Sequence, residues 1–421
     1  MGLFFSLVLS AAVSLRGASR VLELVSGVFA LPEAAPAWYT GRLWLLRVGY
    51  YKLTRPKAQA TDWVWIIDHT IQLGTQKCLV ILGVRLSALP PPGTCLRHEH
   101  VEPLALVPVQ TSTGAVVYQQ LTDAVAHTGV PREILSDGGS DLQAGIALFQ
   151  QAHPETQAVY DIKHKTALVV KHELGEDARW PAFTQHAAQT KQRVPQTPLA
   201  FLAPPTQRRK ARYMNVDILI RWGRKVLAYL ASPRPSGKDG VTAAQLVAAY
   251  GWLQDFRDAL QDWGEVLQIV DTTEHWVRSQ GLSPGCIHVL APQVLAVAHT
   301  ERGQRVAHDL LTFVEAQAAK AAPHERLLGS SEVIESVFGK LKRVEQQQAR
   351  SGFTGLVLVT GALVSPTTPE VIEKALETVS TTQVRQWCQQ HLGPSVQAQR
   401  QQAFRQLKPE EEKQVHFPLA A

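Results

Sequence analysis

The sequence has 421 residues, enough for roughly two to three domains of about 150 residues each. Hydrophobic residues make up 45% and charged residues 19%, which excludes a mostly disordered chain and a collagen-like fibre, and the net charge is +6. The four cysteines lie far apart with no CxxC pair, so we expect neither a disulfide scaffold nor a zinc ribbon.

The start of the chain is apolar over residues 2–13. No basic residue precedes this segment, as one would in a signal peptide, and it is too short to cross a bilayer. No other segment reaches the roughly 18 consecutive apolar residues of a membrane span. We therefore expect a cytoplasmic protein without membrane contact.

Positive charge is concentrated in two zones. Residues 1–60 hold seven basic and two acidic residues, and residues 163–225 hold thirteen basic and four acidic residues. Between residues 226 and 325 the balance reverses to seven basic and eleven acidic residues. This distribution predicts a polyanionic partner contacted at two places, although each zone alone is also typical of a solvated surface.

Residues 14–50 are expected to be helical, with a break at the prolines of residues 31–36. The second helix, over residues 38–47, carries Arg42 and Arg47 beside apolar residues. Residues 1–58 thus predict a small DNA-binding segment like a helix-turn-helix, and a plain helical hairpin explains the pattern equally well.

Short apolar runs bounded by turn residues follow, and they predict an α/β sheet of mixed direction. Helices are expected between the later strands, over residues 114–127 and 142–151. The five predicted strands cover residues 63–67, 78–84, 104–109, 133–136 and 158–160.

Beyond residue 180 the strand pattern disappears. Residues 180–325 predict amphipathic helices, with a break at residues 232–237, and a further helix is expected over residues 330–348.

Three acidic residues stand out. Asp68 and Asp137 each follow a predicted buried strand, and Glu335 lies in the helix predicted over residues 330–348. Two such strands side by side, with the helix laid across them, would bring three carboxylates within a few ångströms of one another. Like charges that close are costly unless a cation lies between them, so the pattern predicts a divalent metal held by oxygen ligands.

The helix around Glu335 has a clear pattern. Ile334, Val337, Leu341 and Val344 form one apolar stripe, whereas Glu335 and Lys342 share another face, seven residues apart. A carboxylate followed by a lysine on one face suits a metal beside a phosphate. Glu332 lies one turn earlier and is an alternative third acid.

The motifs WIIDHT around Asp68, ILSDGG around Asp137 and VIESVFGKLK around Glu335 resemble the three acids of DDE transposases. The segment from Glu335 to Lys342 resembles the E-x6-K signature of the insertion-sequence kind. The arginine that this signature places four residues before the glutamate is replaced by Ser331.

This resemblance implies a ribonuclease H-like mixed sheet interrupted by a large all-helical insertion. Asp137 and Glu335 are 198 residues apart, so about 150 helical residues would be inserted before the last catalytic helix. The implied divisions are a catalytic core over residues 59–178, a helical insertion over 179–325, the final core helix over 326–350 and a C-terminal helical region over 351–421.

The activity implied by the resemblance is metal-dependent strand cleavage and strand transfer at the ends of a mobile element. Asp68, Asp137 and Glu335 would hold Mg²⁺ or Mn²⁺, and Lys342 would contact a phosphate. The partners would be double-stranded DNA, as element ends and target, and a second copy of the chain, in a nucleoid-associated homodimer. Further DNA contacts are expected from basic residues of the second zone, namely Lys163, Lys165, Arg208, Arg209 and Lys210.

Other interpretations stay open. A ribonuclease H-like nuclease without strand transfer, or a DNA-binding protein that has lost catalysis, would carry similar motifs. Asp161, after the fifth predicted strand, either assists the site or only caps the helix that follows it.

Overall fold

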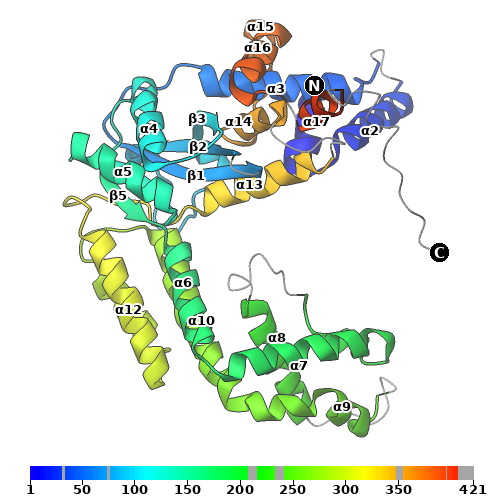
Figure 1. Ribbon diagram of the computed structural model, residues 1–421, viewed down its shortest axis with the longest axis vertical. Helices are drawn as coiled ribbons and strands as arrows, with labels where there is room; N and C mark the ends of the chain where they lie inside the picture. Colours follow the sequence, from blue (N-terminus) through cyan, green and yellow to red (C-terminus); the bar gives the residue numbers. More distant parts are fainter. Residues whose placement is uncertain are drawn as a thin grey trace, which may run out of the picture. The chain divides into compact units, whose positions relative to one another are not determined.

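The computed structural model describes residues 1–30, 34–73, 76–206, 216–232, 241–347, 354–394 and 396–405. The chain forms two compact units (Figure 1). The first combines Met1–Val159 with Ser331–Ala421, and the second is Tyr160–Ser330. The second unit begins at residue 160, earlier than the insertion predicted from residue 179.

A five-stranded mixed sheet forms the centre of the first unit, in the order β3-β2-β1-β4-β5. Strand β1 pairs antiparallel with β2 and parallel with β4, and β2 pairs antiparallel with β3. This is a ribonuclease H-like sheet, and all five predicted strands are confirmed. The strands are β1 (Trp63–Leu73), β2 (Gln76–Arg85), β3 (Glu102–Val109), β4 (Glu133–Ser136) and β5 (Gln157–Tyr160).

Strand β1 is longer than the sequence predicts. Its parallel pairing with β4 ends where Ile67 meets Ser136, but its antiparallel pairing with β2 continues, so that Asp68 lies opposite Val80. The prediction that Asp68 follows the end of a strand was therefore wrong. Asp68 lies inside β1, because the partner strand β2 extends the hydrogen-bonded ladder beyond the apolar run.

Helices α4 (Gly114–Thr128) and α5 (Ser140–Ala152) confirm the two helices predicted between strands. They cover one face of the sheet, which they share with Trp65, Ile67 and Leu79 in one buried core. Side chains alternate between faces along a strand, so Asp68 and Cys78 belong to the opposite face.

Helix α13 (Glu332–Glu345) confirms the helix predicted around Glu335 and packs against β1 (Figure 1). Burial raises the pKa of the Cys78 thiol, and the charge of Glu345, at the end of α13, raises it further. Helix α13 therefore lies on the same sheet face as Cys78. The apolar stripe that the sequence predicts on this helix is buried throughout: Ile334, Val337, Leu341 and Val344.

The remaining helices of this unit come from the two ends of the chain. Helix α3 packs against α14, α15 and α16, so segments far apart in the sequence form one helical layer. These helices are α1 (Gly2–Phe5), α2 (Leu15–Val28), α3 (Trp38–Thr54), α14 (Val359–Leu363), α15 (Pro369–Thr378), α16 (Thr381–Leu392) and α17 (Val396–Arg405).

Two basic residues of the predicted DNA-binding segment are used inside this layer. Arg47 donates hydrogen bonds to the carbonyls of Leu376 and Val379 at the end of α15, where a cation stabilises the helix dipole. The ammonium of Lys52 is fully buried and donates to the carbonyls of Val364 and Ser365, at 2.8 and 2.9 Å. These two cations stabilise the fold of α3 against the C-terminal helices.

The second unit is helical, as the sequence predicts for residues 180–325. Its longest helix, α10, packs against α6, α8, α11 and α12. The predicted break at residues 232–237 lies almost wholly outside the described residues. The helices are α6 (Ile162–Gly175), α7 (Arg179–Arg193), α8 (Val216–Ala231), α9 (Ala243–Tyr250), α10 (Arg257–Gln280), α11 (Ile287–Leu295) and α12 (Glu301–Ala318).

Across the described ranges of both units, no helix combines the length and the apolar character that crossing a membrane requires.

Candidate active site

Asp68 and Asp137 each follow one member of a residue pair in two parallel strands. Ile67 of β1 pairs with Ser136 of β4, and each aspartate follows one member of that pair. Neighbouring strands lie about 4.8 Å apart, so the backbones of Ile67 and Ser136, just before the two aspartates, are adjacent. Both side chains are half-buried. That their carboxylates meet stays a prediction.

Local hydrogen bonds orient both aspartates. The Oδ1 of Asp68 accepts from the backbone N–H of His69 at 2.6 Å, and the Oδ1 of Asp137 accepts from the N–H of Gly139 at 3.1 Å. A Cβ at position 139 would lie 3.2 Å from this Asp137 oxygen, tighter than most real contacts of a Cβ. Glycine therefore lets the turn close onto the carboxylate.

Glu335 lies in the first turn of α13, on the helix that packs against β1. Its side chain is half-buried, as is that of Glu332, whereas Lys342 is exposed. The apolar stripe of α13 faces the protein, so the carboxylates of the first turn flank the buried surface.

The loop before β3 forms hydrogen bonds with the exposed side of α13. The ammonium of Lys340 donates to Nδ1 of His98 at 3.0 Å, and this leaves Nε2–H of His98 to donate to the hydroxyl of Ser336 at 3.1 Å. Both partners lie on α13, next to Glu335. These bonds restrict rotation of the helix that carries Glu335.

The donor set suits a divalent cation that prefers hard oxygen ligands. Asp68, Asp137 and Glu335 offer only carboxylate oxygens, and the first two lie on neighbouring strands of a rigid sheet. Among the residues that the structure describes, no group of three such ligands that includes Asp68 or Asp137 lies within 4.8 Å of one another. A shared metal site of these three residues therefore stays a prediction.

The other predicted site residues have structural roles in the helical unit. Asp161 is fully buried and caps α6, its Oδ2 accepting from the N–H of His164 at 3.0 Å. Lys165 forms an ion pair with Asp309 at 2.8 Å. The remaining predicted DNA contacts of the second basic zone, Arg208, Arg209 and Lys210, lie outside the described residues.

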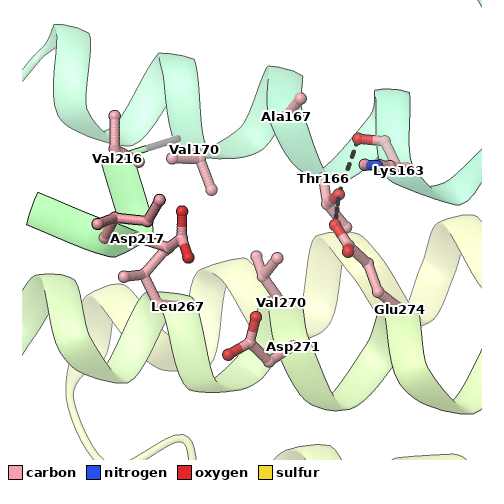
Figure 2. Close-up of a pocket in the computed structure, with 11 residues that line it drawn as sticks. Lys163, Thr166, Ala167, Val170, Val216, Asp217, Leu267, Val270, Asp271 and Glu274 are labelled. Atoms are coloured by element: carbon pink, nitrogen blue, oxygen red, sulfur yellow. Dashed lines mark hydrogen bonds between the residues drawn. The ribbon is translucent and has the colours of Figure 1, made fainter. Parts of the chain in front are cut away.

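Lys163 lines a cavity of about 260 Å³ within the helical unit, between α6, α8 and α10 (Figure 2). Three carboxyl groups, those of Asp217, Asp271 and Glu274, share its wall. Burial raises the pKa of Glu274 to about 7, although a hydrogen bond from Thr166 and the charge of Lys163 oppose the shift. The contact of Lys163 with DNA stays a prediction.

Sequence reasoning missed two residues beside the aspartates. His69 directly follows Asp68, and Asp141 lies four residues after Asp137 in the first turn of α5. A second aspartate, Asp141, follows Asp137 in the segment Ser136-Asp137-Gly138-Gly139-Ser140-Asp141. This repetition was a signal that Asp141 has a role of its own, but only the fold shows what it contacts.

No family model and no curated protein matches the chain. Among solved structures, the chain is similar to the Drosophila P element transposase strand transfer complex, at 11% sequence identity and a TM-score of 0.43. The similarity covers 87% of this chain and 91% of that one.

Proposed function

We propose that the protein is a DDE-type transposase of the insertion-sequence kind, which cleaves DNA strands at the ends of a mobile element and joins them to target DNA. The observation that carries this proposal is the register pair Ile67–Ser136, because the residues directly before Asp68 and Asp137 are neighbours in two parallel strands. The carboxylates of α13, the helix packed against the same β1 strand, supply the third acid.

Asp68, Asp137 and Glu335 would hold Mg²⁺ or Mn²⁺. Such an ion, when bound, polarises the scissile phosphate and lowers the pKa of water for attack. The chain itself contributes rigidity: β1 is paired with both β2 and β4 up to Ile67, and Asp68 is still paired with Val80 of β2. Preorganised charge of this kind is a large part of catalysis in phosphoryl transfer.

The DNA would be double-stranded, and Lys342 is the side chain best suited to contact it near the site. It is exposed, and seven residues along α13 from Glu335 its side chain returns to the same helix face. Because two element ends must be cut and joined together, the active species would be a homodimer on DNA.

The experiment uses the purified full-length chain with Mg²⁺ and labelled duplexes that carry the sequences flanking the gene. We compare wild type with Asp68→Asn and with Asp62→Asn, which removes a carboxylate bonded to Arg85 near the start of the same strand. We expect cleaved and joined products from wild type and Asp62→Asn, and more than about 100-fold less of both from Asp68→Asn.

Equal product from wild type and Asp68→Asn would overturn the proposal. Cleavage without any joined product would identify a nuclease instead. Retarded DNA with no cleavage by the wild type would identify a DNA-binding protein that has lost catalysis.

A further inference from the structure

A polar network lies on the sheet face opposite Asp68, at the same end of β1. The ammonium of Lys77 donates to Oδ2 of Asp141 at 2.8 Å. Nδ1 of His69 lies 3.9 Å from the same carboxylate oxygen, and Nε2 of His69 lies 3.2 Å from the hydroxyl of Ser112. The network therefore joins β1, β2, the loop before α4 and the first turn of α5.

Asp141 is also part of the turn that carries Asp137. Its Oδ1 accepts from the N–H of Leu142 at 3.1 Å. A Cβ at Gly139 would lie 3.2 Å from Oδ1 of Asp137 and 3.4 Å from Oδ1 of Asp141, so the two carboxylates flank one glycine. Asp137 and Asp141 therefore both lie against the same short turn.

The remainder of α5 is held firmly and gives the turn a fixed base. A Cβ at Gly145 would lie 2.5 Å from Cβ of Val117 on α4, and one at Gly114 would lie 2.7 Å from Cβ of Ala144. The two helices thus approach as closely as glycine permits. The first turn of α5 is the part that needs a further attachment, and Lys77 supplies it from β2.

The ion pair persists across the physiological pH range. Burial alone would raise the pKa of Asp141, but hydrogen bonds from Lys77 and Ser112 and the nearby positive charges lower it to about 2. Its carboxylate is only 14% exposed, so salt screens the pair less than it screens a surface pair.

We propose that Asp141 and Lys77 are positioning residues, whose ion pair holds the Asp137–Gly139 turn in register with the end of β1. The inference rests on the proposed function, because it assigns the pair a role in presenting Asp137 to a metal ion. Neither Asp141 nor Lys77 contacts the reacting atoms. Outer residues that orient metal ligands typically change metal affinity by about 10- to 100-fold when they are replaced.

The test compares Asp141→Asn, Lys77→Met and Lys77→Arg with Arg85→Met. Arg85 is the matched control, because it forms an ion pair with Asp62 near the opposite end of the same β1–β2 hairpin. Its side chain is about as exposed as that of Lys77. Two quantities are measured on the full chain: the affinity for Mn²⁺ alone, and the hydrogen exchange rate of the Gly139 amide. The second needs no metal.

We expect Asp141→Asn and Lys77→Met to weaken Mn²⁺ binding about tenfold and to speed exchange at Gly139. Lys77→Arg should preserve both, because it keeps the cation. Arg85→Met should lower the melting temperature about as much as Lys77→Met does. It should change neither the Mn²⁺ affinity nor the exchange rate at Gly139. The proposal is overturned if Asp141→Asn matches wild type, or if Arg85→Met weakens Mn²⁺ binding as strongly.

The two proposals fail in different ways. If wild type and Asp68→Asn bind Mn²⁺ equally, the proposed metal site is wrong and so is the role of the pair in presenting Asp137. If wild type binds Mn²⁺ more tightly than Asp68→Asn does, and Asp141→Asn binds like wild type, the metal site stands and the positioning role falls.

Discussion

Gly49 of α3 and Leu358, at the start of α14, are in backbone contact. A Cβ at position 49 would lie 1.9 Å from the carbonyl oxygen of Leu358 and 2.8 Å from its carbonyl carbon. The approach is reciprocal, because a Cβ at Gly361 would lie 2.5 Å from the carbonyl oxygen of Gly49. The N-terminal and C-terminal parts of the first unit therefore meet at a point where only glycines fit.

Gly49→Ala is expected to destabilise the protein by about 1–3 kcal/mol or more, because backbone rather than a flexible side chain would have to move. Gly27→Ala is the control, since a Cβ there meets nothing within 4 Å. Because Gly27 lies inside helix α2, its replacement by alanine should stabilise the protein by up to about 1 kcal/mol. Urea unfolding measures both, and equal effects would contradict the close contact.

Lys52→Met should destabilise the protein because it leaves the carbonyls of Val364 and Ser365 without their donor. An unsatisfied buried group costs about 1–3 kcal/mol. Ser365 has a positive φ of 49°, so its backbone depends on such support more than an ordinary turn would. Denaturant unfolding measures the loss, with Lys374→Met on the exposed surface of α15 as the control.

The effect of Lys52 should depend on pH. Burial lowers the pKa of its ammonium to about 7, against about 10.4 in an unfolded chain. Between these values the unfolded state binds more protons, so wild-type stability should rise with pH from about 7 to 10 relative to Lys52→Met. A stability difference that stays constant over this range would contradict the shifted pKa.

The choice between the two glutamates of the first turn of α13 can be tested directly. Glu335→Gln should reduce cleavage of the labelled duplexes by more than about 100-fold, because it would remove a metal ligand. Glu332→Gln should retain activity within about threefold, with circular dichroism confirming that both variants fold. The opposite result would make Glu332 the third acid.

Glu274 should make the helical unit sensitive to pH. Its folded pKa, raised to about 7 by burial, exceeds the unfolded value of about 4.3, so the folded state binds more protons between these values. Stability of this unit should therefore fall as pH rises from about 4 to about 7. Glu274→Gln should remove the decline and gain up to about 3 kcal/mol at pH 8.

The control for this measurement is Glu315→Gln, since Glu315 is an exposed carboxylate on α12. Thermal unfolding followed at several pH values measures both variants. If Glu274→Gln declines with pH as wild type does, Glu274 is ionised throughout and its burial does not raise its pKa.

The amino-acid sequence determined the elements of this protein well because their signals are local. Apolar runs predicted all five strands, and the spacing of Ile334, Val337, Leu341 and Val344 predicted the buried stripe of α13. The same reasoning predicted that Asp68 and Asp137 meet, because both follow residues that had to be buried in one sheet.

Tertiary structure decided which charged residues serve the fold and which remain for a ligand. Arg47 lies in the predicted DNA-binding segment and Lys165 is a predicted DNA contact, and in the fold Arg47 bonds the end of α15 and Lys165 pairs with Asp309. It also placed Asp68 inside β1 and gave Asp141 its lysine partner. Hydrophobic periodicity depends on near neighbours along the chain, whereas the partner of a charge is supplied by distant segments that only folding brings close.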